Sequence, residues 1–154
     1  YGPPKLPEVS TPGEKAFYKA AVGLGAFLND QVIRVTPRHA IDGALLLVSR
    51  SEPQKKFQTF VDRCEIKPVG STAYRLAKVT GGDGDATITF RTIHEWDICA
   101  GVLMVLEAGG KVIDGSGAVM TFNRQLPKHR GVIAANGSLS SGLQDMWADA
   151  MGDK

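Results

Sequence analysis

The pattern of apolar and polar positions divides the chain into two parts at residue 43. Before this point, short apolar stretches alternate with turns made of glycines or an Asn-Asp pair, as is typical of an antiparallel meander. Residues 16–21 and 32–35 are predicted to be two of its strands. The Pro- and Gly-rich opening of the chain, up to Gly13, is predicted to be a loop.

After residue 43, strand and helix patterns alternate. Residues 44–48 form a continuous apolar run, which is typical of a strand buried on both faces. A helix is predicted to begin at Glu52, and its apolar stripe comprises Phe57, Phe60 and Val61. The alternation favours a layered α/β arrangement with a mixed sheet. The remaining strands are predicted at 66–69, 85–90, 111–113 and 131–135. The remaining helices are one that follows Gly70-Ser71 and ends at Gly81-Gly82, one at 96–108, and one that runs from an Asn136-Gly137-Ser138 cap through Trp147.

Composition narrows the class of protein only slightly. The 154 residues suffice for one sizeable core, and the net charge of +2 is spread along the chain, so no nucleic-acid polymer is expected as a partner. No apolar run approaches the ~20 residues that span a bilayer, so no membrane association is expected either. Cys64 and Cys99 lack the spacing of a zinc or redox site and are predicted to be two buried thiols, which favours a cytoplasmic location.

The first candidate site is residues 68–74, where a strand ends and small hydroxyl residues open a helix. Free N–H groups and the positive end of the helix dipole attract anions at such a position. Two interpretations stay open at this point. Either Ser71 or Thr72 simply caps the helix, or the segment binds an anionic ligand.

The second candidate site is residues 93–101, in which Asp97 falls in the first turn of a predicted helix. Three adjacent polar side chains cannot all reach one ion, so Asp97 is a more suitable ligand for a hard cation than His94 or Glu95. The alternative is that Asp97 only stabilises the start of the helix, through its favourable interaction with the helix dipole. His94 is predicted to be a solvated or hydrogen-bonded surface residue.

Four segments, read together, resemble the carboxyl-terminal half of the inositol monophosphatase superfamily. They are FYKAAVGLGAFLNDQVIRV at 17–35, GSTAYRLAKVTGGDGDATITF at 70–90, WDICAGVLMVLEAGGKVIDGSG at 96–117 and FNRQLPKHRGVIAANGSL at 122–139. The resemblance implies part of a layered α-β-α-β-α sandwich. Residues 1–43 would then be a remnant of the amino-terminal antiparallel sheet, and residues 44–154 a carboxyl-terminal α/β domain whose mixed sheet is flanked by helices.

The resemblance also implies an activity, that of a Mg²⁺-dependent phosphoric monoester hydrolase holding two or more ions. Asp97 matches the family's metal-binding aspartate, and Gly70, Ser71, Thr72 and Ala73 match its substrate-lining loop. The expected substrate is a small phosphorylated metabolite, either a 3'(2'),5'-bisphosphate nucleotide or an inositol monophosphate. Arg91 could meet a second phosphate, which favours the bisphosphate.

The family's other metal ligands precede the hairpin with which this chain begins. Asp42 imitates one of them, but Ala40 and Ala44 stand where the motif needs Asp and Thr, so Asp42 is not expected to bind metal. The chain by itself is therefore expected to be an inactive fragment. Its expected partners are the missing amino-terminal half and a second copy of the protein in a homodimer. The alternative is a non-catalytic α/β domain that binds a phosphorylated ligand or a partner protein.

Overall fold

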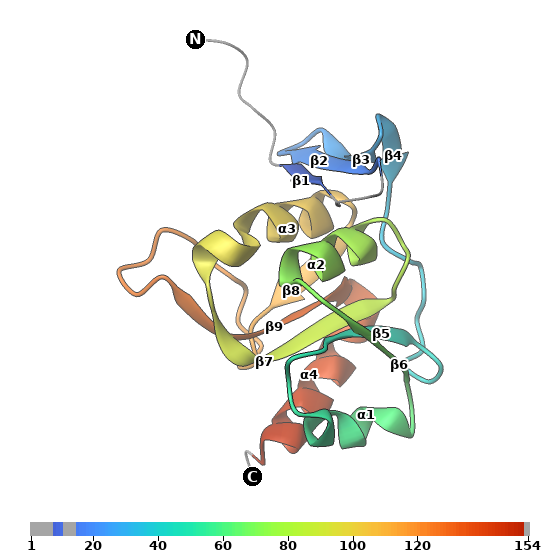
Figure 1. The fold of residues 1–154 in the computed structure, drawn as a ribbon, viewed down its shortest axis with the longest axis vertical. Coiled ribbons are helices and arrows are strands. Elements are labelled where there is room, and N and C mark those ends of the chain that lie inside the picture. The colour runs from blue at the N-terminus through green and yellow to red at the C-terminus, as the bar shows by residue number, and fades with distance from the viewer. Residues whose placement is uncertain (1–7, 11–14, 153–154) are drawn as a thin grey trace.

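The computed structural model describes residues 8–10 and 15–152 and arranges them in layers (Figure 1). An antiparallel sheet of four strands lies at one end of the molecule, and two helices separate it from a mixed sheet of five strands. Two further helices cover the far face of the larger sheet. This arrangement confirms the predicted α/β class, with a mixed sheet flanked by helices and preceded by an antiparallel sheet.

The smaller sheet has the strand order β1-β2-β3-β4, and each strand pairs antiparallel with the next, as predicted for a meander. The strands are β1 (Glu8–Ser10), β2 (Phe17–Ala21), β3 (Gly25–Leu28) and β4 (Gln31–Ile33). The prediction of a loop up to Gly13 is wrong for β1. Backbone pairing of Val9 with Tyr18 decides the structure here, although the surrounding prolines and glycines favour a loop.

The larger sheet has the order β6-β5-β7-β9-β8, in which β5 pairs parallel with both neighbours and the remaining pairs are antiparallel. Strand β5 therefore lies inside the sheet, as its apolar run predicts. The strands are β5 (Leu45–Ser49), β6 (Glu65–Val69), β7 (Ala86–His94), β8 (Gly110–Ile113) and β9 (Lys128–Asn136). Strand β7 is longer than predicted, and its pairing with β9 shifts register between Thr89 and Thr92.

The helices begin close to the predicted residues. They are the 3₁₀ helix η1 (Gln54–Phe57), α1 (Gln58–Val61), α2 (Thr72–Thr80), α3 (Glu95–Glu107) and α4 (Gly137–Met151). Phe57 and Phe60 are buried as expected, but Val61 is 52% exposed, which corrects its assignment to the apolar stripe. Consecutive side chains are rotated by about 100° on a helix, so Val61 faces solvent where Phe60 faces the core.

The middle layer, α2 and α3, touches both sheets. Tyr18 and Ala20 of β2 pack against Met104 of α3, while Leu76 of α2 and Val102 of α3 belong to a cluster with the larger sheet. A third cluster, on the opposite face of the larger sheet, contains the aromatic side chains Phe57, Phe60, Phe90 and Trp147. The position of α2 relative to α3 is thus fixed from two sides.

The linker between the sheets is held by side chains of the larger one. Asp85 accepts hydrogen bonds from Thr36 Oγ1 at 2.6 Å and from the backbone N–H of Leu45 at 2.8 Å. Asn136 donates to the carbonyl oxygens of Thr36 and Arg38, at 2.7 Å each. The predicted domain boundary at residue 43 falls in this linker and stays a prediction.

The two cysteines differ in environment, which corrects the prediction that both are buried. Cys64 is buried, whereas Cys99 is exposed on α3, one turn after the exposed Trp96. None of the helices in the described part of the chain is both long and apolar enough to cross a bilayer.

Candidate functional site

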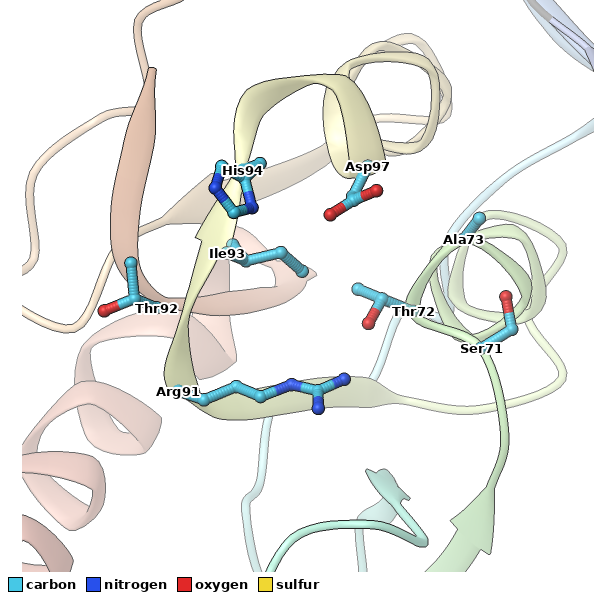
Figure 2. A pocket seen from close by; sticks show the side chains of 8 residues that line it. All are labelled: Ser71, Thr72, Ala73, Arg91, Thr92, Ile93, His94 and Asp97. Carbon is cyan, nitrogen blue, oxygen red and sulfur yellow. The ribbon is translucent and has the colours of Figure 1, made fainter. Parts of the chain in front are cut away.

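An open pocket of about 450 Å³ lies where α2 and α3 begin, beside the end of β7 (Figure 2). In Figure 2 the Asp97 side chain reaches in from α3, Ser71 and Thr72 lie across from it at the start of α2, and Arg91 extends from β7. The lining residues are Ser71, Thr72, Ala73, Arg91, Thr92, Ile93, His94 and Asp97. The fold thus brings both candidate segments of the sequence to one pocket.

Asp97 differs sharply from the other acid in the first turn of α3. Glu95 is buried, and its carboxylate accepts hydrogen bonds from the backbone N–H groups of Asn123, at 2.7 Å, and Arg124, at 3.4 Å. It therefore ties the loop before β9 to the helix. Asp97 makes no hydrogen bond or ion pair with any residue that the structure describes. Its carboxylate is available to a ligand in the pocket.

Ser71 caps α2, since its Oγ accepts a hydrogen bond from the backbone N–H of Tyr74 at 3.3 Å. The capping interpretation is thus confirmed for this hydroxyl. The backbone of Ser71 has φ 57° and ψ 121°, a conformation that a residue with a Cβ adopts at a cost. Such strain is typical of functional sites, and here it turns the chain so that Thr72 and Ala73 face the pocket.

Gly70 does not line the pocket, although it precedes the three residues that do. A side chain here would collide with the guanidinium of Arg50, which packs directly against the glycine. Arg50 is exposed and its guanidinium is the flexible end of the side chain, so it can move aside, and this contact alone does not require a glycine. Its predicted contact with a substrate stays a prediction.

Thr72 is held by Arg75, a residue that sequence reasoning missed. Arg75 is only 1% exposed and donates from Nη2 to Thr72 Oγ1 at 3.1 Å. Burial lowers the pKa of Arg75 to about 10. The signal in the sequence was weak, because an arginine beside the apolar Leu76 of a helix is usually taken for a solvated side chain.

A guanidinium, that of Arg91, lies across the pocket from Asp97 (Figure 2). Arg91 is exposed and makes no hydrogen bond or ion pair within the described part of the chain. It lies within the register shift of β7, where the strand departs from regular alternation. His94 is half-buried in the pocket wall, and its ring stacks on Trp96 with centroids 4.4 Å apart and an interplanar angle of 16°. The sequence predicts a surface residue, and the structure adds that this half-buried side chain lines the open pocket.

A complete metal site is not formed by these residues. Among residues 8–10 and 15–152, no group of three or more His, Cys, Asp or Glu side chains gathers where it could hold an ion. Asp42 does not line the pocket. Its Oδ1 instead accepts a hydrogen bond from Arg63 Nε at 2.7 Å, and this contact lowers the pKa of Asp42. Asp97 therefore fits a hard divalent ion as one of its oxygen ligands, and the other ligands would have to come from elsewhere.

Comparison with known proteins identifies close likenesses. The model of the inositol monophosphatase family matches residues 2–151. A protein named Nus factor SuhB, from Xylella fastidiosa, is 31% identical over 94% of this chain and 56% of its own length. A fructose-1,6-bisphosphatase/inositol-1-monophosphatase from Thermotoga maritima is 36% identical over 75% of this chain and 46% of its own length.

Solved structures show the same fold. An inositol monophosphatase (IMPase) of Thermotoga maritima superposes with a TM-score of 0.80 at 28% identity, covering 90% of this chain and 53% of its own. The inositol monophosphatase of Anabaena gives a TM-score of 0.74 at 26% identity, covering 87% of this chain and 57% of its own. The chain thus spans about half the length of the relatives that it matches.

Proposed function

Because this chain belongs to the inositol monophosphatase family, we propose that it is part of a Mg²⁺-dependent phosphomonoesterase acting on a small phosphorylated metabolite. One observation carries the proposal most directly. Asp97, the residue that matches the family's metal-binding aspartate, has a carboxylate without a protein partner in the described residues, at a pocket lined by Arg91 and a helix start. A phosphate ester and a divalent cation are the ligands that such a pocket suits.

In this proposal the residues of the chain bind and orient rather than react. Asp97 supplies one oxygen ligand for metal. Bound Mg²⁺ would lower the pKa of a water molecule and offset the charge of the phosphoryl oxygens. The start of α2 attracts the anion, Arg91 is placed to meet a second phosphate group, and the loop from Ser71 to Ala73 shapes the wall against which the ester lies.

A second part of the same protein is needed for activity in this proposal. The described residues offer one carboxylate, whereas two or more Mg²⁺ ions, each with an octahedral shell and one or two carboxylate ligands, need more than a single carboxylate to hold them together. We therefore expect further ligands from outside these 154 residues. The 154-residue chain alone should bind Mg²⁺ weakly and release almost no phosphate.

The choice of substrate rests on Arg91. An exposed guanidinium without a protein partner in the described chain suits a second phosphate group, so a 3'(2'),5'-bisphosphate nucleotide is favoured over an inositol monophosphate. The alternative substrate keeps support from the relatives, because the Thermotoga maritima protein is named for both fructose-1,6-bisphosphatase and inositol-1-monophosphatase activity. A cytoplasmic enzyme is proposed for either substrate.

The test uses the full-length protein that contains these residues. Phosphate release is measured from adenosine 3',5'-bisphosphate and from inositol 1-phosphate, with Mg²⁺ and with a chelator. We expect Mg²⁺-dependent turnover that is faster for the bisphosphate, and Arg91→Met should lower that preference while leaving turnover of the monophosphate nearly unchanged. Turnover that persists after chelation would refute the metal-dependent mechanism.

A non-catalytic role is the second candidate. The absence of a gathered metal-ligand group in the described residues favours it, as does the name Nus factor carried by the SuhB relative. In that case the pocket would bind a phosphorylated ligand or a partner protein without hydrolysis. A full-length protein that binds phosphate tightly but turns over neither test ester, with or without Mg²⁺, would support this candidate.

A further inference from the structure

We infer that Arg75 is a positioning residue that fixes the hydroxyl of Thr72 as a hydrogen-bond donor to an oxygen of the bound phosphate. The inference rests on the proposed function, since it concerns the same pocket. Arg75 is buried and does not itself line the pocket, so it would act on the ligand through Thr72, whose hydroxyl becomes a hydrogen-bond donor.

The guanidinium of Arg75 joins α2 to the neighbouring strands. Its Nε donates to Thr87 Oγ1 at 3.1 Å, and its Nη1 donates to the carbonyl oxygen of Val69 at 3.0 Å. Its Nη2 donates to both Thr89 Oγ1, at 3.0 Å, and Thr72 Oγ1, at 3.1 Å. With four hydrogen bonds in a rigid planar fork, the side chain has little freedom to move.

This arrangement settles the direction of the bond to Thr72. A guanidinium has donors only, so Thr72 Oγ1 must be the acceptor in its contact with Arg75. A hydroxyl carries one proton of its own, and that proton makes no hydrogen bond to another described residue. Since Thr72 lines the pocket, its proton is left for an acceptor atom on the ligand. Phosphate oxygens at neutral pH are such acceptors.

The charge of Arg75 acts in the same direction. None of its four hydrogen bonds goes to a carboxylate, and the acid that acts on it electrostatically, Glu52, is occupied by the backbone N–H of Phe90 at 3.1 Å. With a pKa of about 10, Arg75 remains protonated at neutral pH. A buried cation that lacks a carboxylate in contact attracts an anion in the adjoining pocket, because the interior screens charge weakly.

A purely structural role is the competing explanation. Arg75 could serve only to tie α2 to β7 through Thr87 and Thr89, with the contact to Thr72 as a by-product. That explanation expects a loss of stability on substitution of Arg75 but unchanged affinity of the folded protein for phosphate. The two explanations therefore differ in a binding measurement on folded protein.

The experiment measures the affinity of the full-length protein for inorganic phosphate in the presence of Mg²⁺, by calorimetry. Thr72→Val removes the hydroxyl while keeping the shape, and Thr72→Ser keeps the hydroxyl. We expect Thr72→Val to weaken phosphate binding about tenfold, as for loss of a hydrogen bond to a charged group, and Thr72→Ser to stay within about threefold of the parent. Thr59→Val, an exposed position on α1, is the matched control.

The role of Arg75 is tested by a double-mutant cycle. Arg75→Lys keeps a cation but not the planar fork, so it should also weaken phosphate binding about tenfold, whereas Arg63→Lys at the surface should not. The double variant, Arg75→Lys with Thr72→Val, should have the same phosphate affinity as the single variant that binds phosphate less tightly. The second substitution adds no loss because Arg75 acts through Thr72. Thermal unfolding identifies variants that are folded at the temperature of the measurement.

The outcomes separate this inference from the proposed function. If Thr72→Val or Arg75→Lys binds phosphate as tightly as the parent, Arg75 has only its structural role. If the two losses multiply in the double variant, Arg75 does not act through Thr72, and the inference is equally wrong. That result leaves phosphatase activity of the parent untouched. If the expected pattern of affinities is found in a protein that hydrolyses neither ester, the inference holds and the phosphatase proposal fails. A parent protein that binds no phosphate overturns both.

Discussion

Two acids in the first turn of α3 show how strongly local packing decides the role of a residue. Glu95 and Asp97 lie two positions apart, and both carboxylates interact favourably with the positive end of the helix dipole. Glu95 is directed into the protein, where it accepts hydrogen bonds from two backbone N–H groups of the loop before β9, whereas Asp97 is directed into the pocket. The sequence motif marks Asp97 as the candidate metal ligand, but nothing in the order of residues predicts that the carboxylate of Glu95 has a structural role.

The two thiols should differ in reactivity. Cys64 is buried, and burial raises its pKa, so its thiolate is scarcer at pH 8 than that of an ordinary thiol. Cys99 is exposed. We expect a disulfide reagent such as dithiobis(nitrobenzoate) to modify one thiol quickly in the native chain and a second only after denaturation. Cys99→Ser should remove the fast phase, and a fast phase that survives this substitution would contradict the assignment.

At the scale of elements, the pocket depends on the close approach of α2 and α3. A side chain on Gly101 of α3 would lie 2.5 Å from Cδ1 and 2.8 Å from Cβ of Leu76 on α2. Glycine therefore lets the two helices pack closely in their middle, and this packing sets the distance between the helix starts that carry Thr72 and Asp97. The site is a consequence of helix packing rather than of either segment alone.

Gly101→Val should force these helices apart. We expect it to lower the free energy of unfolding by about 2 kcal/mol, since overpacking a close contact costs about 1–3 kcal/mol. Gly137→Val is the matched control, because a side chain on Gly137 at the start of α4 would meet nothing within 4 Å. Chemical denaturation of both variants checks the expectation. Equal free energies of unfolding for Gly101→Val and Gly137→Val would show that the α2–α3 contact accommodates a side chain at position 101 without strain.

The sequence predicts most elements of this fold because their patterns are regular, and its failures have physical causes. Strand β1 is short and depends on pairing with β2 rather than on its own composition. The extension of β7 passes the exposed pair Arg91 and Thr92 at the register shift, which interrupts the alternation. Arg75 escapes notice because its partners are distant in sequence, in strands that only the fold brings near.

At the scale of the whole molecule, the outer face of the smaller sheet exposes apolar side chains. The pairing of Phe27 with Val32 places both side chains on the face opposite the buried Tyr18 and Ala20, and no helix of the described chain covers that face (Figure 1). Phe17 and Val32 are 53% and 64% exposed. Large exposed apolar side chains grouped on a sheet favour association. We therefore expect the isolated chain to associate, with another part of the protein or with itself.

Sedimentation velocity of the 154-residue chain tests this expectation. The sedimentation coefficient should rise with concentration, and Val32→Lys should reduce that rise because a charge on the outer sheet face opposes burial. Val61→Lys changes an equally apolar exposed residue, but on α1 at the other end of the molecule, and should have little effect. A monomer at all concentrations that is unaffected by either substitution would contradict the expectation.

Asp97 carries the central claim, and one measurement tests it most directly. In the full-length protein with saturating Mg²⁺, we expect Asp97→Asn to reduce the rate of phosphate release by at least about a hundredfold, because an amide replaces a charged metal ligand. Asp145→Asn, an exposed acid on α4, is the control and should retain the parent rate. If Asp97→Asn released phosphate at the parent rate, with the same dependence on Mg²⁺, Asp97 would not be a metal ligand of this protein.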